Sequence, residues 1–384
     1  MEIVFISSIF PQTNYSGYLS EAIIQITDKE GINFSVYHEK DRGLTQHENF
    51  YATWRPGFFS FFQIIYKISK DKPQIVHIHH ELNMYGGIVS VLIFPLFVVF
   101  LKVKKVKSIV TIHAVSSLKA IDDRFVSVFR GDATHIKPWM LKIIFIYVYS
   151  IICRYASLII VHTSLLKSIL VNDYKAIGEK VEVIPHGVPM IEVRIQKKKD
   201  DKFYLFFGYI VRRKGLENVI HGFSRFMERN RMADVKLVLA GGVIQGQEFA
   251  LDEIKKMIRR LGIEQHVYIT GFIDKKEIKE FFNNAYAVIL PASLSVAASG
   301  PLAQAFAYGK CVIASKIGNL CEEIQDGYNG ILIENSKWED AFEFTWKNEQ
   351  IVRDIEQHVV GTAIERNWNR IASLHVQLYK RIYG

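Results

Sequence analysis

One stretch decides the fold: Phe203-Tyr204-Leu205-Phe206-Phe207-Gly208, five apolar or aromatic residues in a row before a glycine. Unbroken hydrophobicity of this length predicts a β-strand that is buried on both faces, because a half-exposed strand alternates with polar residues. Runs of the same kind recur along the chain, separated by helix-like segments. They are Glu2–Ile6, Ile75–His79, Ser108–Ile112, Ser157–His162, Val235–Ala240, His266–Thr270, Ala287–Leu290 and Cys311–Ser315.

This rhythm predicts an α/β fold of two Rossmann-like, doubly wound domains whose parallel strands point toward a shared cleft. The length of 384 residues also suits two domains of ordinary size. A charged stretch, residues 196–201, separates the two series of strands. We therefore expect an N-terminal domain over residues 1–195, a linker over 196–202 and a C-terminal domain beginning at residue 203.

The composition indicates an ordered protein of a reducing compartment. Hydrophobic residues make up 49% of the chain and charged residues 23%, which excludes a disordered polymer. The cysteines Cys153, Cys311 and Cys321 have neither disulfide-framework nor zinc spacing. Glu2 lies where a signal peptide needs positive charge, so residues 1–6 are interpreted as a first strand. These features predict a cytoplasmic location.

The net charge of +9 is concentrated in the first half. Residues 101–199 hold 17 basic and 7 acidic residues, interleaved with aromatic and aliphatic ones. This pattern fits an anionic membrane surface or a phosphorylated acceptor, and an ordinary solvated basic face remains the alternative. No nucleic-acid-binding motif accompanies the charge, so no nucleic-acid partner is expected.

Two apolar segments resemble membrane spans. Met84–Leu101 has 18 residues without a charge, and Trp139–Ile152 has only Lys142. The first lies between two predicted strands, where a crossover helix is required, and Pro95 interrupts it. We expect both to be core helices or helices lying on a bilayer surface, as part of a peripheral association with the inner face of the cell membrane.

The sequence after Phe207 predicts an anion site. The chain turns at Gly208 and then presents Arg212, Arg213 and Lys214 before a helix that starts near Leu216. Cations at the carboxyl end of a parallel strand, beside a helix N-terminus, bind phosphate groups. Surface charge without a ligand is the simpler alternative.

A second anion site is predicted after the strand that ends at Leu290. Small residues dominate Ser293–Ala305, so the backbone can approach a ligand closely. Ser299 or Gly300 can cap a helix, and Pro301 suits its first turn. A tight turn without a ligand is the alternative, but two anion sites on one domain suit a diphosphate.

With these motifs in order, nearly the whole chain resembles family 4 (group 1) of the retaining glycosyltransferases, whose two-domain architecture is called GT-B. The motifs that carry the resemblance are Val110–His113, Val183–Val188, Gly208–Gly215, Val267–Ile273, Ala305–Ser315 and Glu323–Gly330. The resemblance implies that the N-terminal domain binds the acceptor and the C-terminal domain, to residue 365, binds a nucleotide sugar. It also implies that residues 366–384 form a helix crossing back to the N-terminal domain, with its aromatic residues in the core.

The resemblance implies roles for individual residues. Lys214 and Arg212 would pair with the donor diphosphate, His113 would face the donor sugar, and Gly17, in a loop after the first strand, would admit the donor phosphate or the acceptor. The positions expected to contact the donor through the nucleobase or the diphosphate are Gly271, Phe272, Ser299, Gly300, Pro301 and Leu302.

Three positions depart from the family pattern. The family usually has two glutamates eight positions apart, where this chain has Val296 and Gln304. Gln304 can still hydrogen-bond a ribose hydroxyl, whereas Val296 has no polar group for a sugar. Tyr209 stands where many members have arginine, which makes Arg212 the expected diphosphate partner. These departures indicate a variant donor site or an inactive relative.

No metal or other cofactor is expected, because the chain has no Asp-x-Asp motif and fixed cations can disperse the charge of a leaving phosphate. His77, His79 and His80 form the densest ligand-like group, with His77 and His79 on one face of a strand. We interpret them as strand-end residues lining the acceptor cleft rather than a metal site. Asp122 and Asp123 are interpreted as a solvated loop.

The sequence therefore predicts a retaining, metal-independent hexosyltransferase. It would move a sugar from a nucleotide sugar to a glycan or lipid-linked acceptor in polysaccharide or glycoconjugate synthesis. Two alternatives remain: a catalytically silent nucleotide-sugar-binding scaffold, and a nucleotide-sugar epimerase of the same architecture.

Overall fold

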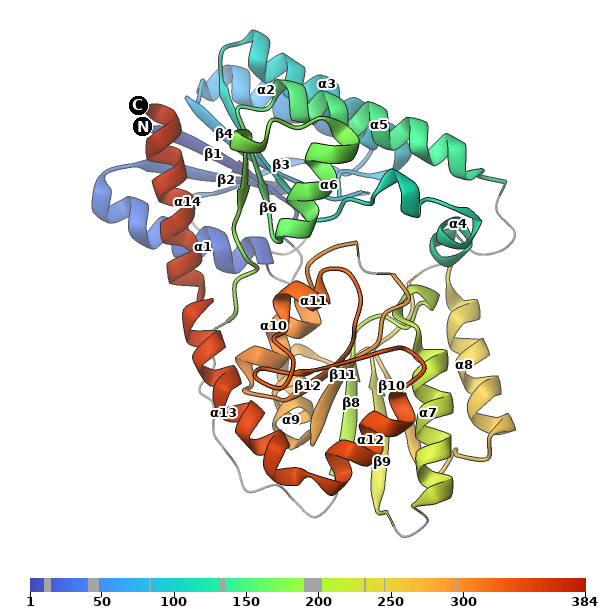
Figure 1. Ribbon diagram of the computed structural model, residues 1–384. Coiled ribbons are helices and arrows are strands. Elements are labelled where there is room, and N and C mark those ends of the chain that lie inside the picture. The colour runs from blue at the N-terminus through green and yellow to red at the C-terminus, as the bar shows by residue number, and fades with distance from the viewer. Residues whose placement is uncertain are drawn as a thin grey trace.

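The computed structural model describes residues 1–9, 15–40, 48–82, 84–130, 135–189, 202–230, 233–244, 246–294 and 296–384. The chain forms two sheets whose neighbouring strands pair in parallel (Figure 1). The N-terminal sheet has the order β3-β2-β1-β4-β5-β6-β7, and the C-terminal sheet the order β10-β9-β8-β11-β12-β13. In both, the order reverses beside the first strand, which is the doubly wound arrangement that binds ligands at the carboxyl ends of the strands.

The strands of the N-terminal sheet are β1 (Glu2–Ile6), β2 (Asn33–Glu39), β3 (Phe50–Trp54), β4 (Ile75–His80), β5 (Lys107–Ile112), β6 (Leu158–Val161) and β7 (Val181–Val183). Those of the C-terminal sheet are β8 (Lys202–Phe207), β9 (Val235–Ala240), β10 (Val267–Gly271), β11 (Ala287–Leu290), β12 (Val312–Ser315) and β13 (Ile331–Ile333). The nine strands predicted from apolar runs all form, each within one residue of its predicted ends. The predicted fold class is confirmed.

Helices cover both faces of the N-terminal sheet. The helices α1 (Tyr15–Thr27) and α14 (Trp368–Tyr383) pack on one face, and α2 (Ser60–Asp71), α3 (Gly87–Val103), α5 (Pro138–Tyr155) and α6 (Ser164–Tyr174) pack on the other. The short helix α4 (Asp123–Arg130) precedes α5. Because α14 packs against α1, the last helix of the chain lies on the first domain, and the two termini are close together (Figure 1).

The helices of the C-terminal domain surround one core. They are α7 (Leu216–Arg229), α8 (Glu248–Arg260), α9 (Lys275–Asn284), α10 (Gly300–Ala307), α11 (Leu320–Glu323), α12 (Trp338–Lys347) and α13 (Glu349–Glu365). The 3-10 helices in the described part of the chain are η1 (Asp28–Glu30), η2 (Leu118–Ala120), η3 (Gly178–Lys180) and η4 (Arg212–Lys214). The predicted domain limits stay predictions, and residues 196–201 of the predicted linker lie outside the described residues.

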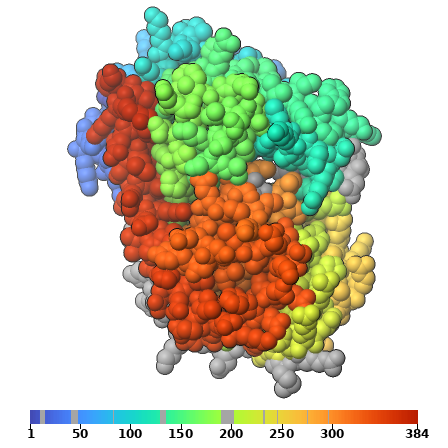
Figure 2. All heavy atoms as spheres, viewed as in Figure 1, coloured from blue at the N-terminus to red at the C-terminus, as the bar shows by residue number. Residues whose placement is uncertain are grey.

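The two domains touch at the carboxyl ends of their strands. The backbone N–H of Val115 donates to Val296 O at 3.1 Å, and Ala114 and Ala297 form an antiparallel bridge. On another side, Thr163 Oγ1 donates to Asn319 Oδ1 at 2.5 Å. The space-filling view shows the second half of the chain resting against the first (Figure 2). The cleft predicted between the domains is thus bounded by direct contacts.

The two apolar segments form the helices α3 and α5. By length and composition α5 is the one helix of the described residues that could cross a membrane, and 28% of it is buried. It packs against α3 and buries Phe145, Val148, Tyr149, Ile152 and Cys153 in the core of the N-terminal domain.

Two sequence interpretations are corrected here. Gly17 does not lie in a loop: it is buried in the first turn of α1. His77, His79 and His80 do not line a cleft, because all three side chains are buried in the sheet's core. Their alternation was predicted well, since His77 and His79 share a face while His80 packs on Phe94 on the other face.

Candidate active site

Two loops of the C-terminal domain meet at the carboxyl ends of β8 and β11. Gly208 has a φ of +137°, and a Cβ atom built on it would lie 3.7 Å from Pro301 Cγ. A Cβ atom on Gly215 would lie 2.8 Å from Ser293 Oγ, and the N–H of Ser293 donates to Arg213 O at 2.9 Å. The fold therefore brings the two predicted anion sites side by side.

The N-terminus of α10 lies on one side of the point where these two loops meet. Ser299 is the N-cap: its backbone is extended, and its hydroxyl oxygen accepts a hydrogen bond from the N–H of Leu302 at 3.2 Å. Pro301 occupies the first turn, where its missing N–H is not needed. The helix dipole places partial positive charge at this end, which suits an anionic group.

Glu323 forms a hydrogen bond with the backbone of the N-cap residue, a role that the sequence did not indicate. Its carboxylate accepts the backbone N–H of Ser299 at 3.3 Å. Burial raises the pKa of Glu323 to about 7, against the opposing effects of the Arg366 charge and of this hydrogen bond. Because Glu323 lies at the end of α11, far from Ser299 in sequence, only the tertiary structure reveals the contact.

Lys214 lies in the loop that follows β8, in the 3-10 helix η4. Burial, together with the charge of Arg213, lowers the pKa of the Lys214 ammonium to about 8. Among the described residues no acidic side chain forms an ion pair with Lys214. The pKa of Arg213 is also lowered by burial, against the charge of Glu81 at the end of β4 in the other domain. A bound diphosphate would supply the missing negative charge.

Arg212 points elsewhere, toward α8. Its Nη2 and Nε atoms donate to the two carboxylate oxygens of Glu253 at 2.5 and 3.1 Å. The guanidinium also lies over the Phe249 ring, 4.8 Å from its centroid. Because the Arg212 charge is already balanced by a carboxylate and an aromatic face, binding a diphosphate would require it to give up these contacts. The structure therefore favours Lys214 over Arg212 as the phosphate ligand.

The rings of Tyr209 and Phe272 lie beside the carboxyl ends of β9 and β10, and we call this pair the aromatic wall. Gly271 ends β10 with a φ of +72°, and 62% of the Phe272 side chain is exposed. The Tyr209 ring meets the Phe272 ring edge-on at 5.9 Å. A Cβ atom on Gly242 would lie 2.2 Å from the Phe272 ring. A Cβ atom on Gly241 would lie 1.9 Å from the carbonyl oxygen of Gly208. The Gly241-Gly242 pair, which the sequence analysis missed although it follows a strand, is required for this wall.

His113 belongs to a row of three imidazoles. Its Nδ1 lies 3.1 Å from Nε2 of His162, and its Nε2 lies 3.0 Å from Nδ1 of His79. At the far end, Nδ1 of His162 lies 2.9 Å from the carbonyl oxygen of Ile184. Removal from water lowers the pKa of all three histidines, that of His162 to about 4, so they are neutral at pH 7.

The carbonyl fixes every proton in the row. A carbonyl oxygen only accepts, so His162 carries its proton on Nδ1 and accepts from His113 on Nε2. His113 therefore has its own proton on Nδ1 and accepts on Nε2 from the Nδ1–H of His79. Nε2 of His79 is left buried without a hydrogen-bond partner among the described residues. Since both His113 nitrogens are engaged, a sugar would meet its ring edge or its backbone.

The row connects to α1 and to α14. Ser16 Oγ, next to Gly17, lies 3.5 Å from Nδ1 of His79. On the same strand as His79, His77 lies 2.7 Å from both Tyr379 Oη and Thr111 Oγ1. The first helix, the last helix and His113 thus share one buried polar cluster.

The departure at Val296 has a structural reason. The side chains of Leu294 and Val296 pack against the hydrophobic core of the N-terminal domain, in the segment that bridges the two domains. An apolar residue at position 296 therefore stabilises the contact between the domains. Gln304 lies in the second turn of α10 and is half-buried.

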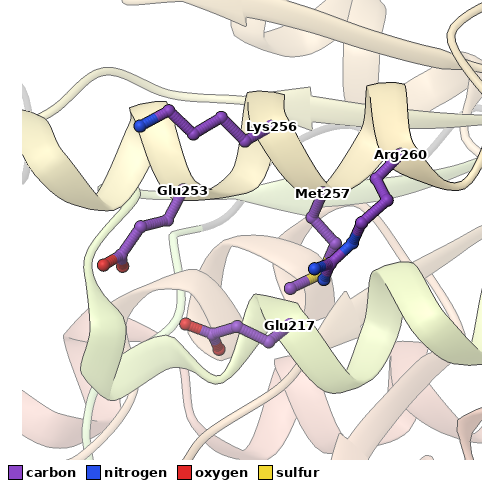
Figure 3. Close-up of a pocket in the computed structure, with 5 residues that line it drawn as sticks. All are labelled: Glu217, Glu253, Lys256, Met257 and Arg260. Carbon is purple, nitrogen blue, oxygen red and sulfur yellow. The ribbon is translucent and has the colours of Figure 1, made fainter.

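A hollow of about 330 Å³ lies outside this cleft, between α7 and α8 (Figure 3). Its lining residues are Glu217, Glu253, Lys256, Met257 and Arg260. Burial, together with the nearby charge of Glu253, raises the pKa of Glu217. The predicted site residues do not line it. Among the described residues no group of histidine, cysteine and acidic side chains could hold a metal ion.

Two facing parallel-sheet domains, with a glycine loop and a capped helix at the strand ends, define the GT-B class of folds. Two family models match consecutive stretches of the chain: Glycosyltransferase Family 4 over residues 27–190 and Glycosyl transferases group 1 over residues 190–353. The chain belongs to this family of glycosyltransferases.

Curated relatives and solved structures are similar to the chain. A D-inositol 3-phosphate glycosyltransferase of Paenarthrobacter aurescens is 25% identical over 224 residues, 55% of this chain and 54% of that protein. A mannosylfructose-phosphate synthase of Agrobacterium fabrum is 23% identical over 202 residues, 50% of this chain and 44% of that protein. The match thus spans about half the length of these relatives.

The solved structures cover nearly the whole fold. Anabaena HepE in complex with UDP has a TM-score of 0.74 at 15% identity, covering 99% of this chain and 100% of that one. The sucrose-phosphate synthase of Thermosynechococcus elongatus has a TM-score of 0.74 at 16% identity, covering 99% and 98%. At these identities the similarity establishes the GT-B fold.

Proposed function

We propose that the chain is a retaining, metal-independent glycosyltransferase. It moves a hexose-type sugar from a nucleotide-diphosphate sugar to a glycan or lipid-linked acceptor, in the synthesis of a polysaccharide or glycoconjugate. One observation carries the proposal: Lys214, desolvated and without a described counter-ion, lies in a glycine-edged loop that touches the N-terminal turn of α10. A diphosphate fits this arrangement better than a neutral ligand does.

The chain's own residues suit departure of a nucleoside diphosphate. As the bond from the anomeric carbon to the phosphate oxygen breaks, negative charge grows on the leaving group. Lys214 and the positive end of the α10 dipole are already fixed beside it, so they stabilise this charge without rearranging. The Tyr209 and Phe272 rings offer a wall for the nucleobase, and the segment around His113 and Ala114 closes the side where the sugar would lie.

A uridine nucleotide sugar is the first donor to test. Solved structures of Anabaena HepE contain UDP, UDP with glucose, and UDP-glucose. Because those proteins share the fold of this chain, they support uridine as the first nucleobase to test. Screening would identify the sugar and the acceptor.

A cytoplasmic location at the inner face of the cell membrane completes the proposal. The cysteines Cys153, Cys311 and Cys321 are free thiols, which fits a reducing compartment. The basic and apolar surface of the N-terminal domain suits an acceptor that is held at a membrane.

The test is a screen of nucleotide sugars by thermal shift, followed by an assay of donor hydrolysis and sugar transfer. We expect one nucleotide diphosphate to raise the unfolding temperature and its sugar conjugate to be hydrolysed slowly without acceptor. Lys214→Ala should abolish both effects, whereas Lys337→Ala, on an exposed lysine of the same domain, should abolish neither. The absence of stabilisation by any nucleoside diphosphate would overturn the proposal.

The same assay separates the alternatives. Binding without hydrolysis or transfer would identify a nucleotide-sugar-binding scaffold, the reading motivated by Val296 and Gln304. Conversion of the donor into another nucleotide sugar without acceptor would identify an epimerase.

A further inference from the structure

Three neighbouring helices of the N-terminal domain expose large apolar side chains. They are Phe58, Phe59, Phe62 and Tyr66 on and just before α2, Ile88, Val89, Leu92, Leu96 and Val103 on α3, and Trp139, Met140, Ile143 and Ile146 on α5. We call this set the apolar face. Soluble proteins rarely expose so many large apolar side chains together, and such a patch marks a binding surface.

The exposed residues of α3 follow the helical repeat. Ile88, Leu92, Leu96 and Val103 are spaced by whole turns, so they form one stripe along the outside of the helix. The opposite stripe, with Phe94, Phe97 and Val98, is buried in the core. A helix that is apolar on both sides needs an apolar environment on both sides.

The three helices form one continuous layer. Tyr147 Oη on α5 donates to Leu92 O on α3 at 3.0 Å, and Ser60 on α2 lies 3.5 Å from Ser90 on α3, hydroxyl to hydroxyl. Figure 1 shows α2, α3 and α5 next to one another along the upper edge of the N-terminal domain. The apolar face is therefore a broad surface rather than three separate stripes.

Basic residues border the apolar face, and acidic residues are scarce there. Lys102, Lys104 and Lys105 end α3, Lys70 and Lys72 end α2, and Lys142 lies in the second turn of α5. The sequence has no acidic residue from 82 to 121 and none from 133 to 172. In α2 the one acid, Asp71, already forms an ion pair with Lys67 at 2.7 Å. Positive charge around an apolar surface complements anionic lipid headgroups.

The direction of the helices relates the apolar face to the cleft. The helix α3 connects β4 to β5 and α5 leads into β6, so both run antiparallel to the strands, and their first turns lie at the cleft end. Trp139 is in the first turn of α5, and α4, just before it, contacts η4 of the other domain. Tryptophan is favoured at the boundary between headgroups and hydrocarbon.

We propose that the apolar face is a docking surface for an anionic lipid bilayer, and that docking holds the α4 side of the cleft at the membrane. The α2, α3 and α5 helices lie in the plane of the headgroups, with their apolar side chains below it and the lysines among the phosphates. The entry of a lipid-linked acceptor past α4 rests on the proposed function, whereas the docking itself does not.

The experiment is sedimentation of the purified chain with lipid vesicles. Vesicles of phosphatidylcholine with 30% phosphatidylglycerol should carry the protein down at ~50 mM NaCl, and pure phosphatidylcholine should carry down far less. The double variant Leu96→Ser with Ile143→Ser should reduce the partition coefficient roughly tenfold or more, because two side chains lose their burial in lipid. Both side chains are more than half exposed, at 55% and 58%, so the fold should survive.

The matched control is Ile364→Ser, which changes a side chain that is 61% exposed on α13 of the other domain. It should sediment like the unchanged protein. Equal sedimentation of the double variant and the control would overturn the proposal, as would the absence of binding to anionic vesicles. A wild-type dimer that the double variant converts to monomers in lipid-free solution would also overturn it, because the face would then cover a second copy.

Thermal stabilisation by nucleoside diphosphates is measured on the same preparations. Stabilisation without vesicle binding would reject the docking surface and the membrane location, and vesicle binding without stabilisation would reject the nucleotide-sugar-dependent activity alone. The two hypotheses therefore fail separately.

Discussion

Lys214 and Arg212 lie two residues apart, but their charges have different surroundings. Lys214 has a pKa lowered to about 8 by burial and by Arg213, and no described acid pairs with it. Arg212 already donates two hydrogen bonds to Glu253. We predict that Lys214→Met weakens binding of the stabilising nucleoside diphosphate about tenfold or more, since a hydrogen bond to a charged group contributes about 1.5–3 kcal/mol.

The matched variant is Arg212→Met, which should change this affinity less than about threefold, since its charge is satisfied by the protein. Isothermal titration calorimetry measures both affinities. The reverse order, with Arg212→Met the more damaging, would show that Arg212 leaves Glu253 when the ligand binds, as the family resemblance implies.

The imidazole row makes a prediction about protons. Because Ile184 O accepts from His162, the geometry places a proton on Nδ1 of His79, His113 and His162 alike. Long-range ¹H–¹⁵N spectra of the histidine rings at pH 7.5 should show the Nδ1–H tautomer for all three. His162→Phe removes the acceptor of the His113 proton and should shift the His113 ring nitrogens, whereas His221→Phe should not. An Nε2–H tautomer at His113 in the unchanged protein would contradict the row's direction.

At the scale of elements, the sequence predicted the central strands well and the alternating or short edge strands poorly. Eight of the nine apolar runs mark strands inside the sheets, so hydrophobicity alone located them. The ninth, β10, is a partly exposed edge strand that its apolar run still located. It missed β2, where Asn33, Ser35 and His38 interrupt the apolar pattern, and the edge strand β3. It also missed β7 and β13, three-residue edge strands that are stabilised by one neighbour each.

The candidate site was predictable where it depends on local sequence. The glycine turn, the N-cap and the proline of α10 follow from backbone geometry over a few residues. The Arg212–Glu253 pair and the Ser299–Glu323 bond join residues 41 and 24 positions apart, and no periodicity encodes such partners. Gly17 was misplaced because the helix α1 starts earlier than the motif around it indicates.

The N-terminus of α10 depends on Glu323, and this gives a prediction at the same scale. Glu323→Ala removes the acceptor of the Ser299 N–H and leaves a cavity, which should cost about 1–3 kcal/mol in the free energy of unfolding. Glu323→Gln keeps an acceptor oxygen of the same size and should cost less. Urea denaturation at pH 6 measures both.

The same pair of variants has a pH signature. Burial raises the pKa of Glu323 to about 7, so the native state binds this proton more tightly than the unfolded chain does. The stability that this group contributes is therefore present below about pH 4.5 and is lost as the pH rises through 7. Glu323→Gln should gain stability relative to the unchanged protein between pH 6 and 8.5. A constant difference over that range would contradict the burial of an ionisable carboxyl at this position.

At the scale of the whole molecule, several contacts among the described residues hold the domains together, and three of them show how the domains could move. The Ala114–Ala297 bridge lies at the cleft, the Thr163–Asn319 hydrogen bond lies beside it, and Val188 pairs with Asn367 where the chain enters α14. The helix α14 then packs on α1 of the first domain. Motion of one domain relative to the other must break the first two contacts, whereas the third lies where the last helix leaves the C-terminal domain, the natural position of a hinge.

The buried histidines make the stability of the whole molecule depend on pH. Burial lowers the pKa of His80, His162 and His375 to about 4 and that of His186 to about 3, and lowers those of His77, His79 and His113 as well. In the unfolded chain these histidines bind protons with a pKa near 6.5, whereas in the native state they stay neutral at that pH. Stability is therefore complete above about pH 6.5 and is lost as the pH falls from there toward about 4.

Each histidine contributes up to about 1.4 kcal/mol per pH unit within this window, so several together should lower the urea midpoint steeply between pH 6.5 and 5.5. The predicted change is far larger than the opposing effect of Glu323, a single group whose protonation stabilises the native state over the same range. His186→Asn should make the pH dependence shallower by about the contribution of one histidine. A urea midpoint that stays constant from pH 7.5 to 5.5 would mean that the cluster around His113 accepts protons without unfolding, and the row of neutral imidazoles would have to be abandoned.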